Sequence, residues 1–430
     1  MVYNSKDSSA YYILTWRNFC LKLGRLNTNY WLLLLIVFGG FLIFGFSENV
    51  KGPAIPRMQS DFSLDETQLG ILLAFNSIGY LVACSFTGLL SSKIGIKWTG
   101  IIAFASMAIS GVLMYLSASY AFLSASYFLM YIGNGMLEIG LAIMAARIFT
   151  KNTGAMMNLS HFFYGLSSAV APIVASSMMG WNLFGGELGW RGMYLVMLSL
   201  SLLPIIPSLM AKFPGDNQEH GERMTLKSFT KDPGAWLIVA VLSFGVVSEL
   251  AVGGWLVNFL EKAYGWSTDA AAGMLSIFFV FFMGARLFLG PVTDKIGYTL
   301  SIIILSAFSG ICSLLAIFLG EQGAIWFAIA GIGIAPIYPT VMAMLAKRYP
   351  RGTDTAITFT VTIMGIASVV GNLLIGVIID GVQKLFGNDE ESSLLLGLQA
   401  GYGFIAAMAL LCSVSCFILY RYLHKKNELV

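Results

Sequence analysis

Long apolar stretches alternate with short polar segments along this 430-residue chain. Each stretch is roughly 20 to 25 residues long, which is the length that an α-helix needs to cross a bilayer core of about 30 Å. The pattern therefore predicts transmembrane helices rather than the core helices of a soluble protein. We count twelve of them, at Tyr30–Gly52, Gln68–Leu90, Trp98–Ser119, Phe122–Ile148, Met156–Met179, Gly192–Ala211, Ala235–Leu260, Ala271–Val292, Ser301–Leu319, Ala324–Leu345, Ala356–Ile379 and Gly401–Tyr422.

The chain repeats itself at half length. "FGFSE" ending at Glu48 returns as "FGVVSE" ending at Glu249, and "TGLLSSKIG" returns as "LGPVTDKIG". Matched glycines lie about 200 residues apart, and such a repeat is typical of transporters built from two bundles. The expected fold is an all-α membrane protein with two six-helix bundles related by a pseudo-two-fold axis. Its parts are a cytoplasmic N-terminal segment (1–29), a first bundle (30–211), a cytoplasmic linker (212–234), a second bundle (235–422) and a cytoplasmic tail (423–430).

Composition agrees with a membrane protein, and the charges set its orientation. Hydrophobic residues make up 57% of the chain, charged residues 11%, and the mean hydropathy is +0.79. Most of the 25 Lys and Arg residues fall in alternate loops and in both tails, whereas the other side carries only Arg57, Arg191, Lys262 and Lys384. By the positive-inside rule both termini lie in the cytoplasm. We therefore expect a multi-pass protein of the plasma membrane, and the first 29 residues show no signal peptide.

The sequence lacks the residue patterns on which several classes of function depend. The five cysteines lie mostly inside spans without metal-ligand spacing, so neither a disulfide framework nor a metal site is indicated. No phosphate-binding loop, nucleotide-binding fold or catalytic triad is present. The sequence thus predicts no enzyme, no cofactor and no nucleic-acid partner, and an ion gradient or the gradient of the substrate must supply the energy. The expected partners are a small solute, protons and the lipid bilayer, and we expect a monomer.

Glu138 is an isolated charge inside the fourth span. No other charged residue occurs from Trp98 to Ala146, and a carboxylate in hydrocarbon costs at least a few kcal/mol. Its distance from Arg147 along the helix is about 13 Å, which places it close to the midplane. Because burial disfavours the ionised form of a carboxyl group, Glu138 is a candidate for exchanging a proton during transport. The alternative is a protonated glutamate that donates one structural hydrogen bond between helices.

Two more carboxylates, Glu48 and Glu249, fall at matching positions of the first and seventh spans and complete our candidates for proton coupling. The basic residues within the spans are Lys51 and Arg286. Lys51 lies near the outer end of its span, and we place Arg286 toward the cytoplasmic loop. We therefore expect no cation in the centre of the cavity. An anionic substrate would need one to offset its desolvation. The balance disfavours organic anions, phosphates and nitrate, and it favours neutral polyols and sugars, with cationic compounds as an alternative.

Polar residues at helical spacing supply candidates for substrate binding. Trp255 and Asn258 offer an apolar ring and an amide on one face of the seventh span, a pairing that suits a sugar. Tryptophan near a span end is also a common interfacial anchor. The fifth span carries Asn158 and His161 on one face, and His161 fits a proton relay, a substrate ligand or a structural cap. Four further candidates are Thr362 and Asn372 in the eleventh span and Asn76 and Tyr80 in the second.

Motifs at the cytoplasmic ends of the second and eighth spans carry a family resemblance. "GLLSSKIGIK" and "GPVTDKIG", with two six-span halves and a basic central loop, resemble the major facilitator superfamily, whose loop motif is Gly-x-x-x-Asp-Arg/Lys-x-Gly. The resemblance implies gating at the closed cytoplasmic face, which we assign to Arg286, Asp294 and Lys295, with Asp294 able to pair with Lys295. Ser92 stands where the first copy of the motif has an acid. The alternative is that these charges only fix the topology.

Four further stretches resemble the sugar–proton symporters of the fucose permease type. They are "GNGMLE", "NLSHFFYG", "SELAVGGWLVNF" and "APIYPTVMAML". The resemblance implies that Glu138 is the proton-exchanging group. Members of that family can also carry an aspartate one helical turn before a proline in the first span. Here Gly52 holds that position, and Glu48 lies one turn earlier.

These expectations lead to three hypotheses of different classes. The first is proton-coupled import of a sugar or a similar neutral polar solute by alternating access. The second is a proton-driven exporter of cationic amphiphilic compounds that uses the same carboxylates as counter-ions. The third is a transporter-like sensor that binds its ligand without net flux. We favour the first.

Overall fold

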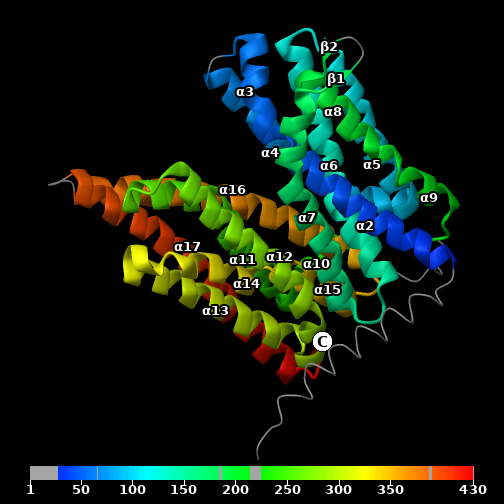
Figure 1. Cartoon of the computed structure of the whole chain (residues 1–430). Helices are drawn as coiled ribbons and strands as arrows, with labels where there is room; N and C mark the ends of the chain where they lie inside the picture. The colour runs from blue at the N-terminus through cyan, green and yellow to red at the C-terminus, as the bar shows by residue number, and fades with distance from the viewer. Residues whose placement is uncertain (1–27, 65, 184–185, 214–223, 387–389, 430) are drawn as a thin grey trace, which may run out of the picture.

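The computed structural model describes residues 28–64, 66–183, 186–213, 224–386 and 390–429, and nearly all of them are helical (Figure 1). Most of the expected N-terminal segment and part of the linker lie outside these residues. The first half contains α2 (Thr28–Asn49), α3 (Lys51–Phe62), α4 (Glu66–Ile94), α5 (Ile96–Tyr115), α6 (Tyr120–Ile148), α7 (Thr153–Met179), the antiparallel strands β1 (Asn182–Leu183) and β2 (Gly186–Glu187), α8 (Gly189–Ser199), η1 (Leu200–Leu202) and α9 (Ile205–Met210). The second half contains α10 (Leu226–Thr230), α11 (Pro233–Tyr264), α12 (Thr268–Ile296), α13 (Tyr298–Leu319), η2 (Gly320–Gly323), α14 (Ile325–Ile334), α15 (Ile337–Arg348), α16 (Thr353–Leu385) and α17 (Glu390–Lys425).

The helices are long enough to cross a membrane, as the apolar pattern predicts. Eleven stretches of the described chain qualify by length and composition, and the shorter apolar part of α4, Ile78–Ile94, adds a twelfth. Two spans are built from separate pieces at a proline. Pro204 lies between η1 and α9, and Pro336 lies between α14 and α15. Such breaks are tolerated in membranes where neighbouring helices satisfy the freed backbone groups.

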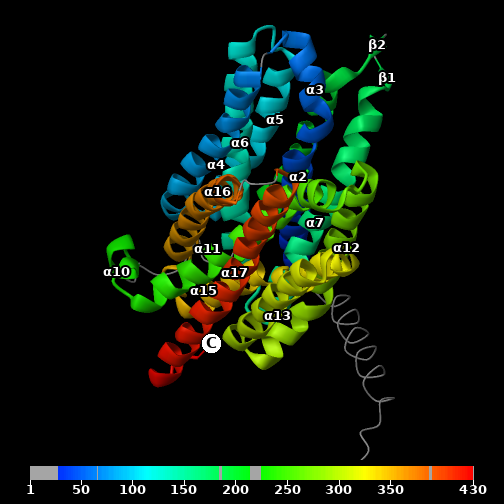
Figure 2. The same ribbon diagram turned by 90° about the vertical axis from the view of Figure 1, so that its left-hand side faces the viewer.

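The two halves meet through symmetry-related pairs of helices. Across the interface α4 packs against α16 and α7 packs against α12, and Figure 2 shows both pairs side by side. Glycines make these contacts close. A side chain at Gly88 would collide with Thr358 of α16, and one at Gly290 would press on Ala155 of α7. Small residues allow helices to approach in this way within a membrane.

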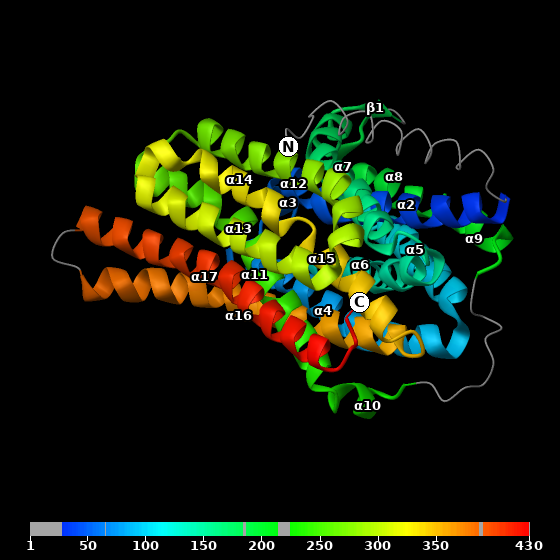
Figure 3. The ribbon, with the colours of Figure 1, turned by 90° about the horizontal axis from the view of Figure 1, so that it is seen from below.

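The bundles meet at one end and diverge at the other (Figure 1). They meet at the ends that carry the start of α7 and the end of α15, which we call the linker face because the linker joins the halves there. They diverge at the ends that carry α3 and the C-terminal end of α16, which we call the opposite face. Seen from below, α15 lies next to α6 in the centre of the molecule (Figure 3). The two halves are therefore in contact at the linker face and lie apart at the opposite face.

Candidate functional site

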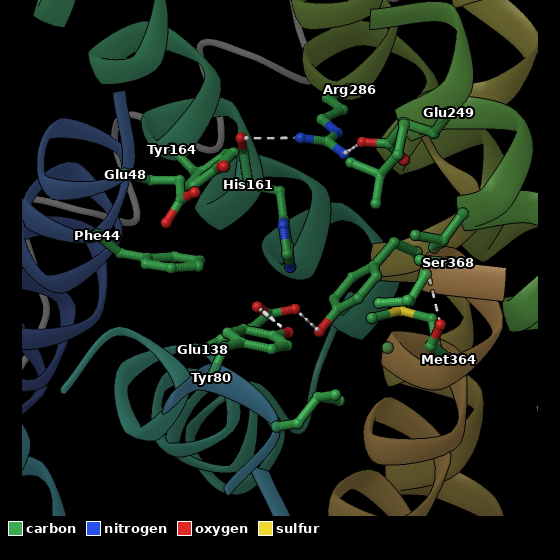
Figure 4. A pocket seen from close by; sticks show the side chains of 16 residues that line it. Phe44, Glu48, Tyr80, Glu138, His161, Tyr164, Glu249, Arg286, Met364 and Ser368 are labelled. Atoms are coloured by element: carbon green, nitrogen blue, oxygen red, sulfur yellow. Dashed lines mark hydrogen bonds and ion pairs between the residues drawn. The ribbon is translucent and has the colours of Figure 1, made fainter. Parts of the chain in front are cut away.

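A central cavity of about 340 Å³ lies between the two bundles. Eight helices line it, four from each half: α2, α4, α6 and α7 from the first, and α11, α12, α15 and α16 from the second. Its described walls combine aromatic rings with three glutamates, one arginine and one histidine (Figure 4). This mixture is typical of ligand sites, in which a mostly apolar pocket carries a few polar groups that orient the ligand.

Glu138 of α6 faces the cavity between two tyrosines. The hydroxyl of Tyr80, from α4 of the same half, donates a hydrogen bond to Oε2. The hydroxyl of Tyr338, from α15 of the other half, donates to Oε1 at 2.9 Å. Figure 4 shows the carboxyl group of Glu138 next to Tyr80. No ion pair is described for Glu138, so hydrogen bonds alone stabilise its charged form in this part of the molecule.

Arg286 of α12 is the cation of the cavity, and this corrects two sequence expectations. The side chain is 3% exposed, and its Nη2 lies 3.3 Å from Glu249 Oε1 of α11. Sequence reasoning placed Arg286 with the gate at the loop and expected no central cation. Both expectations are wrong, because helix phase directs Arg286 into the cavity, two turns deeper than Asp294.

Backbone carbonyls and a ring hold the guanidinium of Arg286 in place. Nε donates to the Ala335 carbonyl at 2.9 Å, beside the break between α14 and α15. Nη1 donates to the His161 carbonyl of α7 at 3.4 Å, and the group lies 4.1 Å from the centre of the Phe282 ring. Arg286 therefore bonds to both halves of the molecule. Three of its five N–H donors have described partners, which leaves two for a ligand.

Glu48 of α2 also lines the cavity and carries its own cation. Lys51 Nζ lies 2.5 Å from Glu48 Oε1. Asn134 of α6 donates to Oε2 at 3.2 Å. Of the three glutamates that line the cavity, Glu48 and Glu249 thus have described cationic partners and Glu138 has none.

His161 of α7 lines the cavity. Its ring packs between Phe41 and Tyr338, with centroid distances of 4.7 and 4.9 Å. The ring is buried, and Nε2 has no hydrogen-bond partner among the described residues. A buried nitrogen without a partner is costly unless water or a ligand supplies one. His161 is therefore placed to contact a solute.

Of the other predicted ligands, Tyr80 lines the cavity, whereas Asn158, Thr362 and Trp255 are not among the described residues that line it. Asn158 is fully buried and bonds to the Gly154 carbonyl of its own helix. Thr362 bonds in the same way to the Thr358 carbonyl. Trp255 is half-buried and is not among the described residues that line the cavity. The side chains of Asn76, Asn258 and Asn372 lie outside the described residues.

Several lining residues escaped sequence reasoning. They include Phe44, Tyr164 and Tyr338. Buried tyrosines and phenylalanines are ordinary in membrane helices, so their type gives no signal. For Tyr338 a signal exists, because it lies in the span that corresponds in the repeat to the span of Glu138.

Asp294 joins the halves at the linker face through backbone groups. Its carboxylate accepts hydrogen bonds from the N–H groups of Gly154 at 2.9 Å and Ala155 at 2.8 Å, at the start of α7. The hydroxyl of Tyr298 donates a third at 2.8 Å. A carboxylate at a helix N-terminus is stabilised by the unpaired N–H groups and the helix dipole. These partners are not the Lys295 ammonium that the motif led us to expect.

At the first copy of the motif a carboxylate also joins the two halves, but it belongs to the helix that packs against the motif. Ser92 stands where Asp294 stands in the second copy, and the carboxylate belongs instead to Asp354 at the start of α16. Arg147, at the end of α6, lies 2.5 Å from Asp354 Oδ2. Ser91 donates to the same oxygen at 2.9 Å. Each of the two pseudo-symmetric contacts at the linker face therefore uses one carboxylate across the interface. In the second copy the motif helix α12 supplies it as Asp294. In the first copy the helix that packs against the motif, α16, supplies it as Asp354.

The family follows from comparison with known proteins. The model of the Major Facilitator Superfamily matches residues 37–329 and 249–429. The chain belongs to this superfamily. An uncharacterized MFS-type transporter of Bacillus subtilis (strain 168), YfkL, is 20% identical over 349 residues, which cover 79% of this chain and 86% of that protein. Polyol transporter 5 of Arabidopsis thaliana is 26% identical over 168 residues, 38% of this chain and 30% of that protein.

Solved structures of the superfamily share the fold. The E. coli fucose:proton symporter FucP superimposes with a TM-score of 0.73 at 16% identity, over 92% of this chain and 99% of that one. The proton:xylose symporter XylE gives a TM-score of 0.73 at 15% identity, over 92% and 96% of the two chains. The twelve-helix fold predicted from the sequence is thus confirmed.

Proposed function

We propose that this superfamily member imports a small neutral polar solute, most simply a sugar, together with a proton. One observation carries the proposal. Glu138 lies in a cavity between the two bundles, held by a tyrosine from each, and it is the described lining glutamate without a cationic partner. A carboxyl group that is stabilised by hydrogen bonds alone can cycle between charged and neutral forms as its exposure changes.

The polar groups of the cavity suit a solute without net charge. Arg286 and Glu249 offset one another, so together they offer donors and acceptors without a net field. His161 adds a ring nitrogen, and Phe44 and Tyr164 add apolar ring faces against which the C–H face of a sugar can pack. FucP and XylE, which share this fold, are described as symporters of fucose and xylose with protons.

Alternating access follows from the two ends of the interface. If the linker face is cytoplasmic, as the positive-inside rule indicates, this structure is the outward-facing state. Asp294 and the Arg147–Asp354 pair then hold the cytoplasmic side closed. Binding of solute and proton favours the inward-facing state only as far as the two states differ in affinity for them.

The test is the substitution Glu138→Gln in proteoliposomes. Glutamine keeps the size of the side chain but cannot release a proton. Uptake against a sugar gradient, driven by a pH gradient, should fall at least about tenfold, while exchange of labelled for unlabelled sugar should stay within about threefold of the wild type. Glu187→Gln is the matched control, because Glu187 lies exposed in β2. Proton-coupled accumulation by Glu138→Gln would disprove the proposal.

Other outcomes would select the competing hypotheses. The two open donors of Arg286 favour an organic anion as the second candidate, and competition by carboxylates rather than hexoses would identify it. Efflux of cationic amphiphiles, seen as drug sensitivity on deletion, would identify an exporter. Ligand binding without counterflow would identify a sensor.

A further inference from the structure

The break between α14 and α15 deprives one backbone carbonyl of its helical donor. In an α-helix the carbonyl of Ala335 would accept a hydrogen bond from the N–H four residues later. That residue is Pro339, which has no N–H. Ala335 and Pro339 are both buried, so solvent does not replace the lost bond. Because a buried carbonyl without a donor is costly, the break needs a donor from outside its own helix.

Arg286 of α12 supplies this donor. Its Nε donates to the Ala335 carbonyl at 2.9 Å. The same guanidinium donates through Nη1 to the His161 carbonyl at 3.4 Å, and its Nη2 lies 3.3 Å from Glu249 Oε1 (Figure 4). Arg286 therefore ties the break in the tenth span to α7 of the other half and to α11 of its own half.

Tyr338 lies inside this break, between Ala335 and Pro339. Its hydroxyl donates to Glu138 Oε1 at 2.9 Å, and its ring packs 4.9 Å from the ring of His161. Arg286 thus bonds to the backbone within one helical turn of Tyr338 and to the backbone of the residue whose ring packs against it.

Tyr80 provides an internal comparison. It donates to the other oxygen of Glu138, but it belongs to α4 of the same half as Glu138. None of the hydrogen bonds described for Arg286 reaches α4. The two tyrosines therefore differ in their link to Arg286, although they bond to the same carboxyl group.

We propose that Arg286 is a positioning residue for the proton site, because its Nε bond to Ala335 sets the break so that the Tyr338 hydroxyl reaches Glu138. The proposal rests on the proposed function, in which Glu138 binds the proton. The guanidinium also lines the cavity. A solute that draws the guanidinium toward itself therefore moves Tyr338 as well, and the backbone of one broken helix links the solute to the proton.

The test is the substitution Arg286→Lys, which removes the bond and keeps the charge. Lysine carries a carbon atom where arginine carries Nε, and its ammonium still provides a positive charge for Glu249. Tyr338→Phe and Tyr80→Phe are each made in the wild type and in Arg286→Lys, and the melting temperatures of the purified proteins are compared. In the wild type each should lower the melting temperature by about 2 °C or more, because each removes a hydrogen bond to Glu138.

The expected difference appears in the Arg286→Lys background. There Tyr338→Phe should lower the melting temperature no further, because the bond is already lost, whereas Tyr80→Phe should keep its full effect. A general weakening of the fold would instead change the effects of both tyrosine variants alike. If Tyr338→Phe has the same effect in both backgrounds, the charge of Arg286 suffices and the proposal is overturned. Equal loss of both effects would overturn it too.

A second variant tests the carbonyl directly. Pro339→Ala restores an N–H four residues after Ala335, so the helix can satisfy this carbonyl itself. Added to Arg286→Lys, it should raise the melting temperature again. No rise would contradict the claim that Arg286 satisfies the break. If Arg286→Lys yields no folded protein, Arg286→Met/Glu249→Leu takes its place in all of these comparisons, because it leaves neither member of the pair as an unpaired charge.

These measurements do not depend on transport, so the two proposals can fail separately. If Glu138→Gln still accumulates solute with protons, the proposed function fails, and the melting comparison still decides what positions Tyr338. If Glu138→Gln behaves as expected and Tyr338→Phe has the same effect in both backgrounds, the role of Arg286 alone is refuted.

Discussion

Tyr338 donates a hydrogen bond to Glu138 from a position 200 residues further along the chain, across the interface between the two halves. The two residues lie in spans that correspond in the repeat, and one supplies the acid and the other its donor. Tyr80 makes the same kind of bond to the other carboxylate oxygen, but from the same half. The state of Glu138 therefore affects a contact that joins the bundles.

The first prediction compares these two tyrosines. A hydrogen bond to a charged group contributes about 1.5 to 3 kcal/mol. Tyr338→Phe should therefore shift the balance of outward-facing and inward-facing states by about tenfold or more, because the lost bond spans the interface. Tyr80→Phe loses a bond within one bundle and should leave that balance unchanged. Distance distributions between spin labels on the two halves measure the populations. Equal shifts in both variants would remove Tyr338 from the interface.

A second prediction concerns the ion pair in the cavity. Arg286→Met leaves Glu249 buried without its partner and should lower stability by about 3 kcal/mol, a cost typical of breaking a buried pair. The double variant Arg286→Met/Glu249→Leu removes both charges and should recover most of that stability without recovering transport. Thermal unfolding of the single and double variants checks this. Additive losses would mean that the two charges do not interact.

A third prediction concerns the acid at the linker face, which lies on the motif helix in the second copy (Asp294) and on the partner helix in the first (Asp354). Asp354→Gly breaks the contacts to Arg147 and Ser91, so the inward-facing population should rise and turnover should fall more than solute binding. Adding Ser92→Asp rebuilds the arrangement of the second half, where Asp294 faces Gly154. The double variant should regain transport. Transport by Asp354→Gly at the wild-type rate would exclude a gating role for this contact.

A fourth prediction concerns how pH changes thermal stability through Asp232, a group outside the membrane spans. Burial of Asp232 opposes ionisation, but hydrogen bonds from Tyr349, the Gly234 N–H and Arg348 outweigh it and lower the pKa of Asp232 below its ordinary 3.8. Its contribution to stability is therefore present above that value and is lost as the pH falls through the lowered one. Asp232→Asn should flatten the loss of thermal stability below about pH 4.

The control for this prediction is Asp380→Asn, because Asp380 is exposed on α16. That variant should melt as the wild type does across the same range of pH. A melting profile of Asp232→Asn that follows the wild type at every pH would contradict the assignment.

The spans and the repeat could be predicted because hydrophobicity is a local property of the chain. Glu138 could be predicted for the same reason, since one charge in an apolar run is visible without a structure. Span ends were less predictable. The helix α17 begins at Glu390, well before the expected Gly401, because its polar first turns extend beyond the apolar stretch.

Partners across the interface could not be predicted, because they depend on the relative rotation of helices that are far apart in sequence. Arg286 was assigned to the gate from its nearness to Asp294 along α12, and only its rotation about the helix shows that it points at Glu249. Asp354 was overlooked, since an acid at the start of a helix is commonly just a cap. Its pairing with Arg147 requires the folded arrangement.

Among the described residues that line the cavity, Glu138 is the glutamate without a cationic partner, and under the proposed function this bears on how far the solute can be concentrated. Under the proposed function, one proton binds at Glu138 in each cycle, and a neutral solute then crosses with one net positive charge. A membrane potential of 100 mV supplies about 2.3 kcal/mol to that charge, which limits accumulation to about fiftyfold in the absence of a pH gradient. Under that function, the pairing of Lys51 with Glu48 and of Arg286 with Glu249 leaves one described lining glutamate for the proton, which fixes the stoichiometry at one and limits the gradient that a cell could maintain.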